Sequence, residues 1–145
     1  MSGVREQAVL DAPVSTVWEL VSDLRRYPEW FPRVFEIKGE RFEEGAEFVL
    51  LSRQPFVGRD EARFFIDRVD ELREIRMHCT LSGFFVHWQL TDAQGGTFLD
   101  AEFGIDPIRR RDRLKDLAGG RRFLRRWLVE AVAGLKQAAT LRPRV

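Results

Sequence analysis

Apolar residues alternate with polar ones through the middle of the chain, over residues 33–105. The alternation is clearest in residues 75–81, 84–90 and 99–105, where every second side chain is apolar. Such period-two patterning predicts antiparallel strands with one buried and one solvated side. The side chains expected on the buried side are Phe35, Ile37, Ile75, Met77, Cys79, Leu81, Phe84, Val86, Trp88, Leu90, Leu99, Ala101, Phe103 and Ile105.

A tight hairpin is predicted around Ser82 and Gly83, which suit a two-residue turn. This turn fixes a register in which apolar residues face one another on the inner side and the two histidines lie opposite each other on the outer side. The expected partners are Ile75 with Leu90, Met77 with Trp88, Cys79 with Val86, and His78 with His87.

Helical spacing of apolar residues follows a first strand predicted at residues 4–10. Asp11-Ala12-Pro13 supplies a helix start, in which Asp11 caps the helix and Pro13 takes an early helical position. The helix is expected to end near Ser22. Its apolar stripe is formed by Val14, Val17, Trp18, Leu20 and Val21.

A second, longer helix is predicted after Pro107, over residues 114–141. Gly119 and Gly120 indicate a break or a loosened first turn, because Gly costs about 1 kcal/mol relative to Ala inside a helix. The apolar stripe of this helix is formed by Phe123, Leu124, Trp127, Leu128, Ala131, Leu135, Ala138 and Ala139.

Between the first helix and the sheet lies the segment DLRRYPEWFPRV, residues 23–34. Its two prolines restrict the backbone at little entropic cost, so the segment is expected to turn the chain sharply from helix into sheet. We call residues 27–32 the elbow. Its aromatic side chains are Tyr27, Trp30 and Phe31.

Composition describes one globular domain, residues 1–145, with 44% hydrophobic and 32% charged residues. A chain of this length can bury a core without metals or disulfides. The single cysteine, Cys79, excludes an internal disulfide and fits a reducing compartment. No apolar run reaches the length of a membrane span, and the N-terminal segment lacks the apolar core of a secretory signal. We therefore expect a cytoplasmic protein.

The order of elements predicts an α+β fold, in which a curved antiparallel sheet of about seven strands wraps around a long C-terminal helix. The strings DAPVSTVWELVSDLRRYPEWFPRV and LSGFFVHWQLTDAQGGTFLDAEFGIDP carry a resemblance to a known family. With the terminal helix, they resemble the START-like, helix-grip superfamily (SRPBCC, Bet v 1-like), closest to its polyketide cyclase/dehydrase and coenzyme-Q-binding branches. The resemblance covers nearly the whole chain. It implies a cavity between sheet and long helix that binds an apolar small molecule.

Large, soft and aromatic side chains on the predicted inner faces suit an adaptable pocket of that kind. Those expected to contact a ligand are Tyr27, Trp30, Phe31, Phe64, Met77, Trp88, Phe103 and Trp127. Plain core packing is the alternative for each, because periodic aromatic residues usually pack. The resemblance places the elbow beside the pocket mouth, so its aromatic residues either cover the ligand or plug a corner of the sheet.

Arg68 is the candidate for chemistry. Alternation from Phe64 and Ile66 places Arg68 on the inner face, where a buried guanidinium needs an acceptor. Aromatase/cyclase members of the superfamily are thought to hold a polyketide carbonyl with a pocket Arg on the corresponding strand, although this chain has Phe64 and Phe65 in place of the tryptophans that flank it there. The alternative is a strand-end Arg paired with Asp67, Asp70 or Glu71.

Neither a cofactor nor a metal site is predicted. The sequence has no Gly-rich phosphate loop, no nucleophile elbow and no metal-spaced Cys/His cluster. His78 and His87 are expected to be neighbours on the outer face, but they lack a third ligand, so a solvated pair is the expectation.

Basic residues gather near the start of the long helix, where residues 105–126 hold nine of them against three aspartates. The nine are Arg109, Arg110, Arg111, Arg113, Lys115, Arg121, Arg122, Arg125 and Arg126. Three interpretations stay open: a solvated helix face, attraction to an anionic membrane surface, or docking to RNA or a ribosome, as a toxin-like relative of the coenzyme-Q branch is thought to do. The net charge of only +1 argues against a general nucleic-acid binder, so no DNA partner is expected.

Three functions therefore stay open. The first is non-catalytic or weakly catalytic binding or transport of a hydrophobic small molecule, namely a lipid, quinone or polyketide. The second is a polyketide aromatase/cyclase that acts through positioning and an Arg. The third is an interaction module that uses the basic face. The sequence does not decide between a monomer and a homodimer.

Overall fold

The computed structural model describes residues 2–54, 58–106 and 120–141. The elements in chain order are β1 (Ser2–Leu10), α1 (Val14–Ser22), the 3-10 helix η1 (Leu24–Glu29), β2 (Val34–Lys38), β3 (Glu47–Gln54), β4 (Gly58–Asp70), β5 (Glu74–Cys79), β6 (Phe84–Ala93), β7 (Gly96–Ile105) and α3 (Arg121–Leu141). The N-terminal part of the long helix predicted from residue 114, with Gly119, lies outside the described residues.

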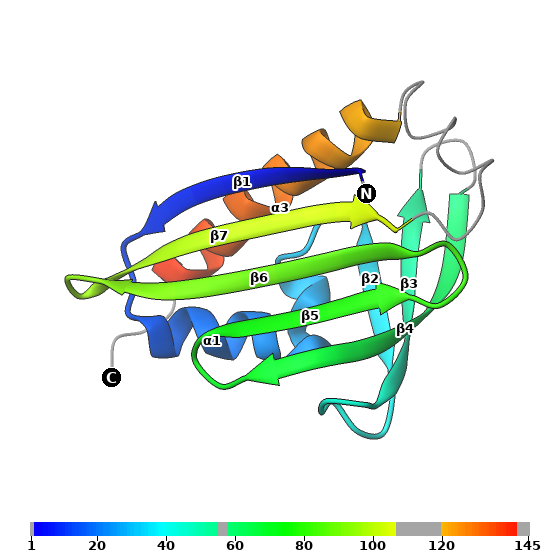
Figure 1. Ribbon diagram of the computed structural model, residues 1–145, viewed down its shortest axis with the longest axis horizontal. Coiled ribbons are helices and arrows are strands. Elements are labelled where there is room, and N and C mark those ends of the chain that lie inside the picture. Colours follow the sequence, from blue (N-terminus) through cyan, green and yellow to red (C-terminus); the bar gives the residue numbers. More distant parts are fainter. Residues whose placement is uncertain (1, 55–57, 107–119, 142–145) are drawn as a thin grey trace.

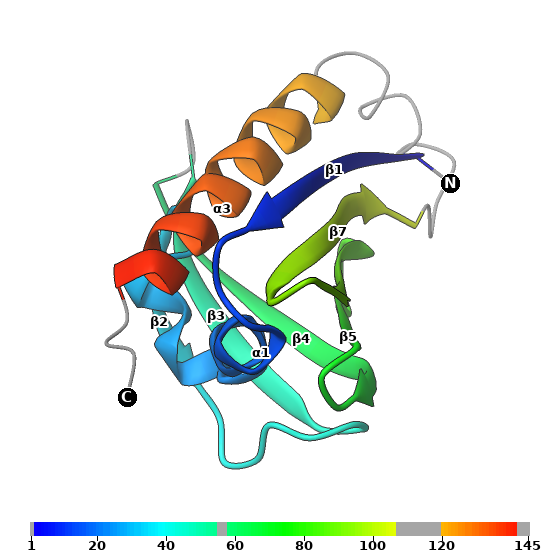
Figure 2. The ribbon, with the colours of Figure 1, turned by 90° about the vertical axis from the view of Figure 1, so that its left-hand side faces the viewer.

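The strands form one seven-stranded antiparallel sheet in the order β1-β7-β6-β5-β4-β3-β2. Strands β2 to β7 pair with their neighbours in sequence, and β1 pairs with β7 at the far edge. Both α1 and α3 lie behind the sheet in Figure 1, and the end view in Figure 2 shows the strands bending around them. The predicted curved sheet around a C-terminal helix is confirmed.

The β5–β6 hairpin has the predicted strands but a different register. Ile75 pairs with Trp88 and Met77 with Val86, so each partner is two residues away from the expected one. A shift of two residues keeps the alternation of side chains, because successive side chains of a strand point to opposite faces. The apolar residues of both strands that were predicted on the inner face therefore remain there.

The turn of this hairpin explains the shift. It spans residues 80–83 rather than two residues, and the Gly83 amide donates a 3.0 Å hydrogen bond to the Cys79 carbonyl. Gly83 has a φ of 78°, in the left-handed region that glycine adopts without strain. Leu81, expected on the inner face, lies in this turn and is 88% exposed.

Helix α1 begins later than its sequence suggests. Pro13 is the N-cap residue, in an extended conformation, and no side chain caps the helix, so the predicted capping role of Asp11 is wrong. The carbonyl of Pro13 instead accepts the amides of Thr16 and Val17 at 3.0 and 3.2 Å. Backbone hydrogen bonds thus satisfy the first turn without a side-chain acceptor.

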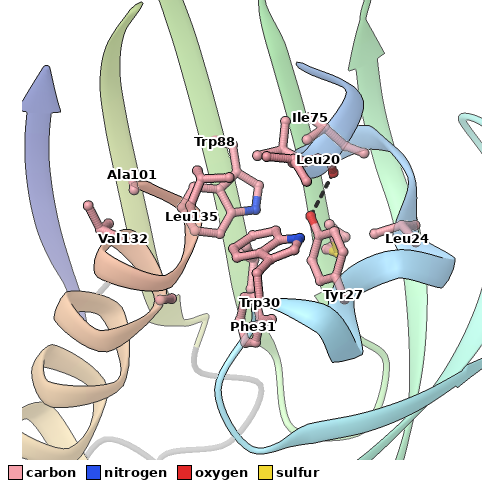
Figure 3. Packing of buried hydrophobic residues seen from close by; sticks show 14 of the residues in the cluster. Leu20, Leu24, Tyr27, Trp30, Phe31, Ile75, Trp88, Ala101, Val132 and Leu135 are labelled. Atoms are coloured by element: carbon pink, nitrogen blue, oxygen red, sulfur yellow. Dashed lines mark hydrogen bonds between the residues drawn. The ribbon is translucent and has the colours of Figure 1, made fainter. Parts of the chain in front are cut away.

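The elbow fills the space between the sheet and the C-terminal half of α3. Its rings, Tyr27, Trp30 and Phe31, are 2%, 6% and 3% exposed and contact one another at centroid distances of 4.8, 5.4 and 5.5 Å. Trp30 and Phe31 also contact Trp88 of β6 at 5.7 and 6.3 Å, as Figure 3 shows. Aromatic pairs at these distances add stabilisation beyond the area that they bury.

Tyr27 anchors the elbow to α1. Its hydroxyl donates a 2.6 Å hydrogen bond to the carbonyl of Val21, drawn as a dashed line in Figure 3. Burial raises the pKa of Tyr27 far above the ordinary value of a tyrosine, so the hydroxyl stays protonated.

Two further contacts join α3 to the elbow. The indole Nε1 of Trp127 donates a 2.8 Å hydrogen bond to the carbonyl of Pro32. One to two turns further along α3, Gly134 lies so close to the elbow that a Cβ atom there would overlap the carbonyl oxygen of Trp30. Glycine is therefore required at residue 134, although it weakens a helix interior.

Candidate ligand-binding cleft

An open cleft lies between the sheet and the N-terminal half of α3. The part formed by the described residues has a volume of about 1300 Å³. Residues 49–54 of β3 and 60–64 of β4 form one wall, residues 79–84 around the β5–β6 turn form a second, and residues 120–127 form a third. Pockets for small molecules usually measure about 300–1,000 Å³, so this cleft has room for an extended ligand.

Aromatic rings cover the floor of the cleft. Phe84 stacks on Trp127 with centroids 5.2 Å apart and planes within 10°, and its edge meets Phe64 at 6.1 Å. All three residues line the cleft. They come from β4, β6 and α3, so the sheet and the helix share one continuous aromatic surface there.

Two polar residues of β3 face the cleft and were not identified from the sequence. The side-chain amide of Gln54 donates a 2.8 Å hydrogen bond to the hydroxyl of Ser52. Its oxygen, Oε1, is buried and has no hydrogen-bond partner among the described residues. Leu50, Ser52 and Gln54 are each two residues apart, so their side chains share one face of the strand. The sequence therefore could have placed Ser52 and Gln54 on the inner face with Leu50.

Arg33 is the third cleft residue that the sequence did not identify. It follows the elbow directly, lines the cleft, and has a φ of 72°, which is uncommon for a residue with a Cβ atom. Its Nε atom is buried and has no acceptor among the described residues. Its guanidinium carbon lies 5.3 Å from the ring centroid of Phe123 on α3, a cation–π distance.

Helix α3 contributes two more cations. Arg122 and Arg126 line the cleft together with Phe123 and Trp127. These four residues are at positions i, i+1, i+4 and i+5, which lie on one side of a helix. Within the described part of the chain, neither Arg122 nor Arg126 forms an ion pair.

The eight residues predicted to contact a ligand separate into two groups. Phe64 and Trp127 line the cleft, and ligand contact by these two stays a prediction. The other six do not line it and are buried in the core at 6% exposure or less, so their ligand contact stays a prediction that this cleft does not support. These six are Tyr27, Trp30, Phe31, Met77, Trp88 and Phe103. Their rings fill the space that the prediction assigned to a ligand.

The predicted inward position of Arg68 is also wrong. The register of β4 against β5 shifts between Ile66 and Arg68, and this bulge turns the side chain of Arg68 outward. The side chain is 62% exposed, and its Nε lies 2.8 Å from a carboxylate oxygen of Glu74. The ion-pair partner of Arg68 is thus Glu74, whereas the sequence suggested Asp67, Asp70 or Glu71. Val69, not Arg68, takes the next inner position opposite Ile75.

His78 and His87 are not opposite each other as predicted. His78 lies opposite Phe85 and His87 opposite Arg76. Each imidazole has its own carboxylate: Nδ1 of His78 is 2.8 Å from Asp67, and Nε2 of His87 is 2.7 Å from Glu74. Among the described residues, no group of three or more His, Cys, Asp or Glu side chains could hold a metal ion.

Only the last part of the basic segment lies within the described residues. Arg122 and Arg126 face the cleft, and Arg121 donates to the carbonyl of Gly3 at 3.5 Å. Arg125 is exposed, whereas Arg109 to Lys115 lie outside the described part. None of the described helices is both long and apolar enough to cross a membrane.

Comparisons with known proteins give one family match. A family model described as polyketide cyclase/dehydrase and lipid transport matches residues 1–140. Among curated proteins, no sequence matches significantly.

Three of the solved structures similar to this one share its fold over nearly their whole length. The Zhui aromatase/cyclase from Streptomyces is 16% identical, with a TM-score of 0.74 over 99% of this chain and 96% of that one. A START superfamily protein from Mycobacterium smegmatis is 17% identical, with a TM-score of 0.70 over 95% and 97%. A protein from Thermus thermophilus is 15% identical, with a TM-score of 0.72 over 96% and 97%. At these identities the likeness is one of fold.

Proposed function

Because the chain belongs to the polyketide cyclase/dehydrase and lipid transport family, within the START-like helix-grip superfamily that its sequence resembles, we propose that it binds a hydrophobic small molecule in the cleft between the sheet and α3. The ligand class is a lipid, a quinone or a polyketide. One observation supports this above all: a cleft of about 1300 Å³ whose floor is the aromatic surface of Phe64, Phe84 and Trp127. Burial of apolar ligand area against these rings supplies the driving force.

Binding, rather than a reaction, is the favoured function. The polyketide aromatase/cyclase considered from the sequence was expected to act through Arg68, and Arg68 is on the outer face and paired with Glu74. The hydroxyl groups at the cleft contact Gln54, the Arg63 carbonyl and the Phe84 amide, and none of these groups is a general base. An open cleft with an apolar floor fits a carrier that loads and releases its ligand.

A substitution that fills the cleft tests this function. Ala62 lines the cleft and has a small side chain, so Ala62→Trp should occupy ligand volume. The matched control is Ala133→Trp, which adds the same ring on the exposed side of α3. We expect phenylnaphthylamine, a neutral apolar fluorophore, to bind the wild type and the control with the same affinity. Its affinity for the Ala62→Trp variant should be at least about tenfold lower.

Native mass spectrometry of the purified protein, with solvent extraction of any adduct, would identify the natural ligand class. An apolar adduct on the wild type that is lost from Ala62→Trp supports the proposed site. If the wild type does not bind the fluorophore, or if the filled variant binds it equally well, the cleft is not the binding site. Thermal unfolding of both variants checks that each is folded.

A further inference from the structure

Arg33, directly after the elbow, has an unusual backbone conformation. Its φ of 72° is one of three positive values among the described residues other than glycine. The carbonyl of Arg33 accepts a 2.8 Å hydrogen bond from the amide of Arg53, which fixes the peptide at the start of the sheet. Side chains with a Cβ atom adopt such a φ only when the surrounding structure imposes it, and these positions cluster at functional sites.

The guanidinium of Arg33 lacks the partner that it normally has. Arg33 is half-buried and its Nε is fully buried, and a guanidinium withdrawn from water is usually paired with a carboxylate, because removal of its charge from water is unfavourable. Among the described residues, no carboxylate lies within ion-pair distance of Arg33, and its Nε has no acceptor. The ring of Phe123 faces its charge instead, and this ring also lines the cleft.

The surroundings of Arg33 favour an anion over a cation. Arg122 and Arg126 extend the positive wall along α3. On the β4 side the lining includes Asp60, Glu61 and Arg63, and Arg63 forms an ion pair with Glu47 at 3.3 Å. The acidic groups of the cleft therefore lie on the sheet wall, whereas, among the described residues that line the cleft, the guanidinium groups without an ion pair are those of Arg33 and of Arg122 and Arg126 on the helix wall.

We propose that the cleft takes an apolar molecule with one oxyanionic group, which Arg33 binds together with Arg122 and Arg126 while the aromatic floor holds the apolar body. This inference rests on the proposed function, and it specifies the ligand of the same cleft. A carboxylate or a phosphate monoester supplies the acceptor that Arg33 lacks, because both present two oxygens in the spacing of a guanidinium fork. A neutral ligand of the same shape leaves the guanidinium without an acceptor.

The test compares ligands that differ only in the head group. Dodecanoate, dodecyl phosphate and dodecanol are each titrated against phenylnaphthylamine bound to the wild-type protein, at one fixed low salt concentration. We expect at least one of the two anions to displace the fluorophore about tenfold more tightly than dodecanol, and the preference to decrease at high salt. The tighter anion identifies whether the group is a carboxylate or a phosphate.

Variants then assign the preference to Arg33. Arg33→Gln should bring the affinities of the anion and of dodecanol to about the same value, and Arg33→Lys should retain part of the preference. Arg53→Gln is the matched control, because it removes the same charge from an exposed side chain that packs over Phe35, away from the cleft lining. The control should keep the full preference.

Three results would overturn the inference, and they are distinct. Equal affinities of anions and dodecanol for the wild type remove the anion site and leave apolar binding intact. A preference that survives in Arg33→Gln but is lost in Arg53→Gln moves the site away from Arg33. If neither phenylnaphthylamine nor any of the three ligands binds, the proposed function fails together with this inference.

Discussion

The two halves of α3 pack differently against the same sheet. The C-terminal half packs directly on the elbow, as Trp127 of the N-terminal half also does, and Gly134 brings the helix close enough that only glycine fits. The N-terminal half faces β3 and β4 across an open cleft of about 1300 Å³. The difference lies in the elbow, because its three rings fill one end of the curved sheet and no described segment does so at the other. In this protein, the proposed binding site lies where the third layer ends.

Truncation of one aromatic ring at the elbow end and of one at the cleft end gives the largest expected difference in the free energy of unfolding. Phe103→Ala removes a side chain that is fully buried between the elbow and Trp127, and it should lower the free energy of unfolding by about 3–5 kcal/mol. Phe123→Ala removes a partly buried ring at the cleft and should cost only about 1 kcal/mol. Urea denaturation measures both. Equal losses would mean that the cleft end is packed as firmly as the elbow end.

Gly134→Ala tests the close packing in the filled half. In an exposed helix this substitution stabilises by about 1 kcal/mol, but here the new methyl group meets the backbone of Trp30. We expect a net destabilisation of about 1–3 kcal/mol, as for overpacking in a core.

A neighbour on the same helix provides the control for Gly134. Ala133→Gly, at an exposed position, should lower stability by about 1 kcal/mol through helix propensity alone. Denaturant unfolding of the two variants compares the opposite substitutions. A Gly134→Ala variant more stable than the wild type would show that the helix moves away from the elbow at little cost.

Removal of the Tyr27 hydroxyl gives the smallest effect at neutral pH, about 1 kcal/mol, and this effect depends on pH. Burial raises the pKa of Tyr27 in the folded protein, whereas the unfolded chain titrates near pH 10. The contribution of Tyr27 is therefore complete below about pH 10, and it is lost by up to about 1.4 kcal/mol per pH unit as the pH rises further. Tyr27→Phe should cost about 1 kcal/mol at neutral pH, since it leaves the Val21 carbonyl without its donor.

The measurement for Tyr27 is direct because it is the only tyrosine. Phenolate absorbance of the native protein should appear only as the chain unfolds at high pH, and the stability difference between wild type and Tyr27→Phe should shrink over the same range. A phenolate signal that rises near pH 10 in the folded protein would mean that water reaches the elbow.

The fold could be predicted because its signals are periodic. Apolar alternation in residues 75–105 defined the strands, and the stripe around Trp127 and Leu135 defined the long helix. Both signals average over many residues, so a local error does not destroy them. The two-residue error in the β5–β6 register, for example, left every predicted inner residue of this hairpin except Leu81 on the correct face. Phe35 of β2, also predicted on the inner face, lies instead at a bulge and contacts Arg53 and Arg59.

The cleft could not be predicted because it depends on local irregularities. A bulge after Ile66 reverses Arg68, and a positive φ at Arg33 allows a residue beside the elbow to line the cleft. Neither feature leaves a trace in a hydrophobic pattern. The choice of which aromatic rings pack and which line a cleft depends on how far the elbow reaches under α3, which is a property of the assembled layers. The polar inner positions Ser52 and Gln54 were the part of the site that alternation alone could have given.

The single thiol of the chain lies where the accessibility of the cleft can be measured over time. Cys79, 5% exposed, is on the wall of the cleft beside Phe64 and Phe84. A thiol-reactive reagent must enter the cleft to reach it, and no second cysteine competes for the label. The rate of labelling should therefore fall if the proposed ligand occupies the cleft, and it measures this without any change to the sequence.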